Sequence, residues 1–280
     1  MQRACIEQLA DVWGSIQVLC ATLTPDEWDR PTDCPGWSVK DNVTHIIGIE
    51  STLLGRPSPP PAPSGLPHVH NDLGARNEAW VIARRDVPGA SVLGELEEVS
   101  AARLVALGAM SDEDLAEPTP SPIGVVPYAT FMDVRVMDCW VHEQDIRRAV
   151  DRPGHLDGPA ADASLARLTS SFGFVVGKRV APPEGTTVVW QIAGPQARAL
   201  AVTMRDGRAA AVDAPADVPG DVPGDVPGDV TVRIESDVVT YLCLVTGRWS
   251  AERARQRPDL HITGDRALAL AVMGALDVIP

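Results

Sequence analysis

The chain has 280 residues, 45% of them hydrophobic and 22% charged, so it can bury a sizeable core without covalent cross-links. Its formal net charge of −14 argues against nucleic-acid binding, since the short basic cluster Arg147-Arg148 makes no footprint for a phosphate backbone. The five cysteines are widely spread and form no CxxC pair, which favours a reducing cytosol over a disulfide framework. The N-terminus lacks the pattern of a signal peptide, and no apolar run approaches the ~18 residues that span a bilayer. We therefore expect a cytoplasmic protein that binds neither nucleic acid nor a membrane.

The first half of the chain predicts helices only. Apolar residues recur at helical spacing over five stretches, which are separated by loops rich in proline and glycine. Ser38, with Asp41 three residues later, is close to a capping box and marks the start of the second helix. The predicted helices cover residues 3–23, 38–54, 71–85, 91–110 and 128–150, with short helical turns after Thr24 and Ser111.

The second half mixes helices with strands. Runs rich in β-branched residues predict strands, and Asp206-Gly207 between two of them is typical of a hairpin turn. The change from helices alone to helices with strands predicts an all-α domain at 1–155 and a small α+β domain at 156–280. The predicted strands cover residues 186–192, 200–204, 209–212, 230–234 and 261–263, and the predicted helices 160–181, 237–246 and 265–276.

A four-residue repeat, DVPGDVPGDVPGDV at residues 217–230, lies between two predicted strands. It is interpreted either as a calcium-binding acidic repeat or as a flexible loop expanded by repetition. Single carboxylates separated by Pro-Gly lack the dense set of oxygen ligands that calcium requires, which favours the loop.

The helix predicted at 128–150 carries the strongest chemical signal. Apolar residues surround it, which predicts burial on every side, yet Asp138, His142 and Asp145 form a polar row along one sector. Buried polar groups need partners, and a carboxylate and an imidazole one turn apart point in the same direction. This spacing suits two ligands of one metal ion, and it also suits an ordinary ion pair or a hydrogen-bonded core histidine.

A second histidine, His45, lies on the helix predicted at 38–54, roughly 120° from the centre of its apolar face. That position is typical of an exposed helix histidine. Sequence spacing alone gives no reason for His45 to meet Asp138 or His142.

Two segments carry a recognisable pattern: WDRPTDCPGWSVKDNVTH, residues 28–45, and DCWVHEQDI, residues 138–146. They resemble signatures of the mycothiol-dependent maleylpyruvate isomerase family, which belongs to the wider DinB-like helical bundles. The resemblance implies a DinB-like four-helix bundle in which His45, Asp138 and His142 bind a divalent metal, expected to be zinc. The family usually has Glu at the position of Asp138, so the carboxylate of this chain is one methylene shorter.

The C-terminal half is similar to the smaller α+β domain, sterol-carrier-like in shape, that this family often carries. Its Gly247-Arg248 pair follows an apolar helix, as in the family, where the arginine contributes to the active site. The resemblance therefore implies a catalytic role for Arg248. The alternative is a cation that satisfies carbonyl groups at the C-terminus of a helix.

Other residues are weaker candidates. We expect Trp37 and Trp140 to wall the site and contact the thiol cofactor, although tryptophan in a bundle is usually core. Asp145 is expected to hold a ligand histidine or a backbone amide. For Cys34 a role as nucleophile is one interpretation, but no base is assigned to it, and packing within its loop is favoured.

The predicted function follows from a metal with three protein ligands, which keeps one position open for catalysis. By resemblance, the chain uses mycothiol, a low-molecular-weight thiol, in an isomerase or S-transferase reaction on a small electrophilic or unsaturated acid. Two alternatives stay open: a non-catalytic metal- or ligand-binding regulatory module, and a metal enzyme that uses water without a thiol. The ligand set also suits iron, nickel or manganese.

Overall fold

The computed structural model describes residues 3–213 and 230–278, and the chain forms two compact units, Met1–Ser164 and Leu165–Pro280. Helix α8 (Gly158–Thr169) spans the boundary between them. The repeat that is interpreted as a loop lies outside the described residues except for Val230.

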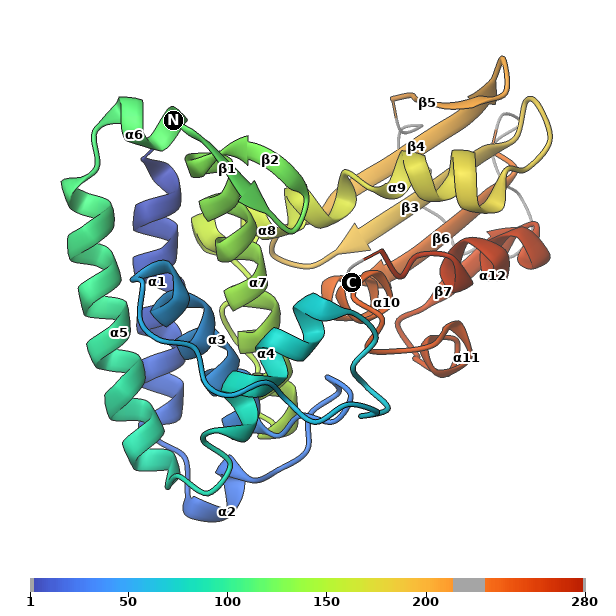
Figure 1. Cartoon of the computed structure of the whole chain (residues 1–280). Helices are drawn as coiled ribbons and strands as arrows, with labels where there is room; N and C mark the ends of the chain where they lie inside the picture. The colour runs from blue at the N-terminus through green and yellow to red at the C-terminus, as the bar shows by residue number, and fades with distance from the viewer. Residues whose placement is uncertain (1–2, 214–229, 279–280) are drawn as a thin grey trace. The chain divides into compact units, whose positions relative to one another are not determined.

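Unit 1 is helical, as its periodicity predicts. Its helices are α1 (Ala4–Cys20), α2 (Pro25–Trp28), α3 (Val39–Leu53), α4 (Asp72–Ile82), α5 (Gly89–Ala109), α6 (Asp112–Ala116) and α7 (Tyr128–Ala149). The four long helices pack as a ring in the order α1, α5, α3 and α7, so that each contacts two others (Figure 1). The shorter α4 packs against α3.

Reciprocal capping explains where α3 begins. Ser38 Oγ accepts a hydrogen bond from the Asp41 amide at 3.2 Å, and the Asp41 carboxylate accepts one from the Ser38 amide at 2.9 Å. These bonds satisfy amide groups that a helix N-terminus leaves without partners. The predicted start of this helix is therefore confirmed.

Helix α7 lies in the core of unit 1, as its apolar surface predicts. Val136, Cys139 and Trp140 have no exposed surface, although they point to different sides of the helix. Burial of one large apolar side chain contributes about 1.5–3 kcal/mol to stability. The same burial requires each polar side chain of α7 to find a partner inside the unit.

A chain of buried charges crosses this core. Glu50 of α3 has 1% of its surface exposed, Arg103 of α5 has 2% and Arg135 of α7 has 3%. Arg103 Nε and Arg135 Nε donate to the two oxygens of Glu50, each at 2.9 Å. One carboxylate thereby joins three helices, and Arg135 Nη1 continues the chain by donating to Asp138.

The stretch between α6 and α7 forms a hairpin that the helical pattern does not predict. Strands β1 (Pro118–Ser121) and β2 (Gly124–Pro127) pair in antiparallel fashion. Proline is tolerated here because each strand is an edge strand, and an edge has one side without ladder hydrogen bonds.

Among its described residues, unit 2 contains one five-stranded sheet. Its strands are β3 (Thr187–Ala193), β4 (Arg198–Arg205), β5 (Arg208–Ala211), β6 (Val232–Asp237) and β7 (His261–Gly264). Their order is β5-β4-β3-β6-β7, with β3 and β6 parallel and the other neighbours antiparallel (Figure 1). Asp206 and Gly207, at φ of 52° and 70°, connect β4 to β5 and confirm the predicted turn.

Unit 2 also contains helices, so the second half is mixed, as predicted. They are α9 (Phe172–Phe174), the π-helical turn η1 (Val175–Val180), α10 (Val238–Val245), α11 (Ala251–Ala254) and α12 (Arg266–Gly274). The prediction of one helix at 160–181 is wrong, because α8 ends at Thr169. The Thr169 and Ser171 hydroxyls donate to carbonyls three to four residues earlier, which competes with regular helix bonding.

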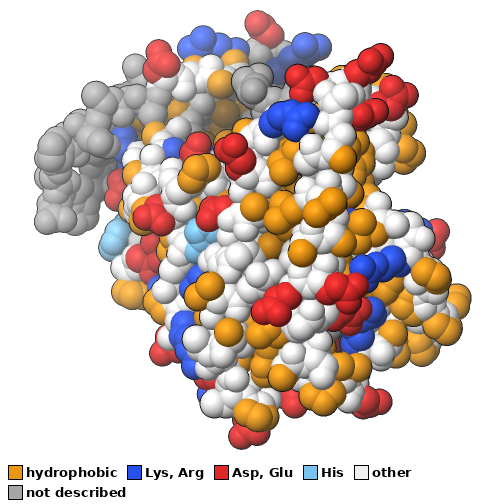
Figure 2. Space-filling view, turned by 90° about the vertical axis from the view of Figure 1, so that its left-hand side faces the viewer, with side chains coloured by type: hydrophobic (Ala, Val, Ile, Leu, Met, Phe, Trp, Pro, Cys, Tyr) orange, Lys and Arg blue, Asp and Glu red, His pale blue; other side chains and the backbone are white. Residues whose placement is uncertain are grey.

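One face of the molecule carries mixed charge. On the face that Figure 2 shows, Asp and Glu side chains are scattered among apolar ones, and Lys and Arg form no continuous stripe. Over residues 3–213 and 230–278, no helix has the length and apolar character needed to cross a bilayer.

Replacing Glu50 by alanine removes the acceptor that two buried guanidinium groups share. Because both charges then stay buried without this carboxylate, we expect the free energy of unfolding to fall by about 3–5 kcal/mol. Urea unfolding followed by circular dichroism measures the change. Glu98→Ala is the matched control, because Glu98 pairs with Arg56 at 2.8 Å while 68% of its side chain is exposed. That control should lose less than about 1 kcal/mol, and equal losses in the two variants would contradict the importance of the buried network.

Candidate metal centre

The three residues predicted to bind a metal lie together in unit 1. His45 of α3 approaches Asp138 of α7, with 3.1 Å between His45 Nε2 and Asp138 Oδ2. His142 Nε2 lies 3.7 Å from Asp138 Oδ1, and the two imidazole centroids are 4.6 Å apart. All three ligand atoms lie within 4.8 Å of one another. The structure thus brings together side chains that are 93 residues apart in the sequence.

Helix packing explains why His45 points inward. Helix α3 contacts α4, α5 and α7, so it is covered on more sides than its apolar stripe suggests. Only 3% of His45 is exposed, and the interpretation as an exposed helix histidine is therefore wrong. His142 is 6% exposed, whereas the Asp138 side chain is 27% exposed and gives the cluster its opening to solvent.

The electrostatics leave His45 neutral and Asp138 anionic at neutral pH. Burial lowers the pKa of His45 to about 4, although the nearby Asp138 carboxylate opposes this shift. For Asp138, burial alone would raise the pKa, but Arg135 and then His45 hold it well below its usual range. A neutral imidazole and an ionised carboxylate are the forms that bind a divalent cation.

The donor spacing also fits a single metal ion. Bonds of about 2.0–2.2 Å to a tetrahedral zinc place neighbouring donor atoms about 3.3 Å apart. His45 Nε2 lies 3.1 Å from Asp138 Oδ2 and His142 Nε2 lies 3.7 Å from the other oxygen, Oδ1, so each imidazole is within reach of a metal bound to this carboxylate. One nitrogen of His45, Nδ1, is buried without a hydrogen-bond partner, so this ring is not fixed by ordinary pairing at both nitrogens. The residues present therefore fit a divalent metal.

Trp37 forms one side of this cluster. Its ring centroid lies 5.0 Å from that of His45 and 5.6 Å from that of His142. Its indole Nε1 donates to Glu78 Oε2 at 2.8 Å, and His68 contacts the same oxygen at 3.0 Å. Glu78 is fully buried, so the Trp37 ring is held in a fixed orientation beside the two histidines.

Two residues that the sequence pattern did not identify hold the cluster in place. Asn42 Oδ1 lies 2.6 Å from His142 Nδ1, and Arg135 contacts Asp138. Asp145, which was predicted to hold a ligand histidine, lies near the same His142 nitrogen at 3.5 Å. Arg135 precedes Asp138 by three positions on a buried helix, and that spacing is the signal that could have identified it. Asn42 contacts a histidine one hundred positions away, so no local pattern indicates its role.

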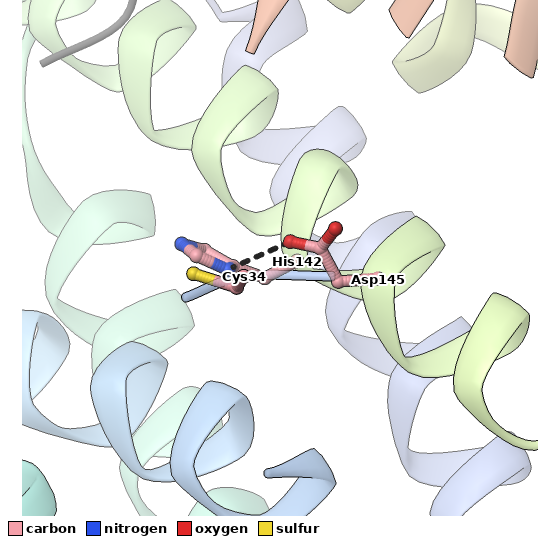
Figure 3. A group of neighbouring side chains, drawn as sticks. All are labelled: Cys34, His142 and Asp145. Carbon is pink, nitrogen blue, oxygen red and sulfur yellow. Dashed lines mark ion pairs between the residues drawn. The ribbon is translucent and has the colours of Figure 1, made fainter. Parts of the chain in front are cut away.

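Cys34 lies beside His142 as well. Cys34, His142 and Asp145 form a second group of possible metal ligands within 4.8 Å of one another (Figure 3). The sequence indicates no base for Cys34, and the structure places the His142 imidazole next to its sulfur. His142 therefore belongs to two overlapping donor groups.

Residues 9–147 match the family model described as the mycothiol maleylpyruvate isomerase N-terminal domain. The chain belongs to this family. An uncharacterized protein of Mycobacterium tuberculosis, found in two strains, is 27% identical to it over 160 residues. That match covers 55% of this chain and 72% of the relative.

Two solved structures share the fold of this family member. A crystal structure of the mycothiol-dependent maleylpyruvate isomerase gives a TM-score of 0.53 at 16% identity. A histidine-to-alanine mutant of the mycothiol-dependent maleylpyruvate isomerase gives 0.50 at 15% identity. Each likeness covers 89% of this chain and 90% of the other chain. At these identities the likeness concerns the fold alone, a helical N-terminal part followed by a mixed part.

Trp140 does not join the cluster. It has no exposed surface, and its indole Nε1 donates to the backbone carbonyl of His155 at 2.8 Å. Successive helical residues differ by about 100°, so Trp140 points roughly away from both Asp138 and His142. The structure gives no support to the predicted contact between Trp140 and a cofactor.

Arg248 belongs to unit 2 and follows α10. Its Nη1 donates to the Thr246 carbonyl at 3.0 Å, which agrees with the interpretation of a cation at a helix C-terminus. The preceding Gly247 has a φ of +66°, and a Cβ there would lie 2.8 Å from the Asp277 carboxylate. The turn therefore requires glycine, while the catalytic role of Arg248 stays a prediction.

The imidazole of His45 should stay neutral in mildly acidic solution. An NMR titration of the metal-free protein, resolved for each histidine, should place the His45 pKa below the usual value of about 6.5. His155 is the internal comparison, because its hydrogen bond to the buried Glu143 raises its pKa. Asp138→Asn removes the charge that opposes the shift and should lower the His45 pKa further. A His45 pKa at or above about 6.5 would contradict this description of the cluster.

Proposed function

We propose that this family member is a metal-dependent enzyme that uses a thiol. In this proposal His45, Asp138 and His142 hold a divalent cation, with zinc as the first choice. The reaction is an isomerisation or S-transfer on a small electrophilic or unsaturated acid, with mycothiol as the thiol. The observation that carries the proposal is the convergence of two imidazoles and one carboxylate from α3 and α7.

The geometry supports a catalytic rather than a structural metal. Three protein ligands leave one coordination position for a water, thiol or substrate. When bound, a divalent cation supplies Lewis acidity that lowers the pKa of a thiol or water. The partly exposed Asp138 gives that position a connection to solvent, and the fixed ring of Trp37 limits it on one side.

The choice of thiol and reaction rests on the family. The solved structures with this fold are named as mycothiol-dependent maleylpyruvate isomerases, which supports a thiol-using isomerase. The low sequence identity leaves the substrate as a chemical class, a small unsaturated acid. Arg248 remains the proposed residue for binding a substrate carboxylate, because a guanidinium offers two parallel donors to it.

We also infer the finer fold assignments from the same family. The ring of α1, α5, α3 and α7 supports a DinB-like four-helix bundle. The five-stranded sheet of unit 2 supports a sterol-carrier-like domain, with the domain boundary expected near residue 155.

Metal content tests the proposal directly. Purified protein should contain about one zinc per chain, and His45→Ala, Asp138→Ala and His142→Ala should each lose both the metal and thiol-dependent activity. Elemental analysis, together with an assay of mycothiol-dependent isomerisation of maleylpyruvate, measures the two quantities. His70→Ala is the matched control, because His70 is an exposed histidine outside the cluster.

The same experiment separates the competing functions. Full activity in chelator-treated, metal-free protein would overturn the proposal. Metal-dependent turnover that needs no thiol would favour an enzyme that uses water. A filled metal site without turnover of any unsaturated acid would favour a regulatory binding module. Asp138→Glu introduces the carboxylate usual in the family and should keep the metal.

A further inference from the structure

His142 is shared by two groups of possible metal ligands. One group contains His45 and Asp138, and Asp138 Oδ1 lies 3.7 Å from His142 Nε2. The other contains Cys34 and Asp145, and Asp145 Oδ2 lies 3.5 Å from His142 Nδ1. A ring nitrogen that carries a proton cannot coordinate a cation, so the position of the ring proton decides which group is competent.

The orientation of the Asn42 side-chain amide is fixed by its own partners. Asn42 has no exposed surface, and its Nδ2 lies 2.8 Å from the Ser38 carbonyl and 3.1 Å from Thr32 Oγ1. A backbone carbonyl can only accept, so the amide nitrogen must face it. The Asn42 oxygen is consequently the atom that faces His142.

This orientation determines the proton position on His142. Asn42 Oδ1 lies 2.6 Å from His142 Nδ1 and can only accept a hydrogen bond, so Nδ1 must carry the proton. The Asp145 carboxylate is a second acceptor near the same nitrogen. In the neutral imidazole the lone pair is then on Nε2, which lies 3.7 Å from Asp138 Oδ1.

We propose that Asn42 is a positioning residue that locks His142 in the tautomer with its proton on Nδ1. The lock directs Nε2 to the group with His45 and Asp138, and it excludes the group with Cys34 and Asp145. The consequence for metal binding rests on the proposed function, whereas the tautomer itself does not. Thr32 and Ser38 orient the Asn42 amide, so the loop before α3 contributes indirectly to the position of the His142 proton.

The tautomer can be measured without any metal. A long-range proton–nitrogen correlation spectrum of the histidine rings in metal-free protein should show His142 with its proton on Nδ1. Asn42→Leu removes the nearer acceptor, at 2.6 Å from Nδ1 against 3.5 Å for Asp145. The Nε2-protonated form, which can donate toward Asp138, should therefore gain population. Asn42→Asp keeps an acceptor oxygen and should keep the wild-type tautomer.

Ser51→Ala is the matched control for folding and packing. Ser51 lies on the same helix, is 1% exposed, and its hydroxyl has no hydrogen-bond partner. Its replacement should leave the His142 spectrum unchanged. A structural role of Asn42 would lower stability in Asn42→Leu without moving the ring proton, so the spectrum separates positioning from stability.

Metal binding provides the second readout. Zinc titration should show an affinity about 10–100-fold lower for Asn42→Leu than for the wild type or Ser51→Ala. Cobalt-substituted wild-type protein should lack the near-ultraviolet absorption of a thiolate ligand, and Cys34→Ala should not change its spectrum.

Three results would overturn the proposal. They are a wild-type His142 with its proton on Nε2, an Asn42→Leu variant with an unchanged tautomer, and thiolate absorption that Cys34→Ala abolishes. If the protein binds no metal but shows the Asn42-dependent tautomer, the positioning role is supported and only the proposed function fails.

Discussion

The candidate site depends on how unit 1 pairs the buried charges of α7. Burial alone would favour the protonated form of Asp138, and a neutral carboxylic acid is a poor partner for a cation. Arg135 reverses this preference, and it can lie in the core because Glu50 accepts from its other side. Arg103 in turn fixes Glu50. The anionic oxygen beside the neutral ring of His45 is thus maintained by a network that reaches across three helices.

Local periodicity accounts for what the sequence predicts well. Each long helix of unit 1 has to bury an apolar stripe, so its position follows from spacing alone. The pair Asp138 and His142 is also a local feature, since residues four apart share one helix face. The contact with His45 is different, because it depends on how α3 packs against α7. Only the resemblance to a family indicated that contact before the structure did.

The features that escaped prediction depend on contacts between elements distant in the sequence. Asn42 acquires its role from a histidine one hundred positions later, and no pattern within its own helix specifies that partner. Trp140 was expected to line the site, but it lies on the side of α7 away from Asp138 and His142, where it is fully buried in the core. The hairpin of β1 and β2 forms where prolines suggest irregular chain, because two edge strands tolerate proline.

The aspartate at position 138 shows why the fold alone does not define this site. An aspartate side chain is shorter than a glutamate, so the facing histidine has to lie closer to the helix that carries it. His45 Nε2 lies 3.1 Å from Asp138 Oδ2. Arg135, one turn earlier on the same helix, donates to the same Asp138 oxygen that His45 contacts, and this hydrogen bond orients the carboxylate toward His45. A fold shared at 16% identity can keep its helices while such contacts change. The chemistry of the cluster is therefore set by a few hydrogen bonds, each traceable to one side chain.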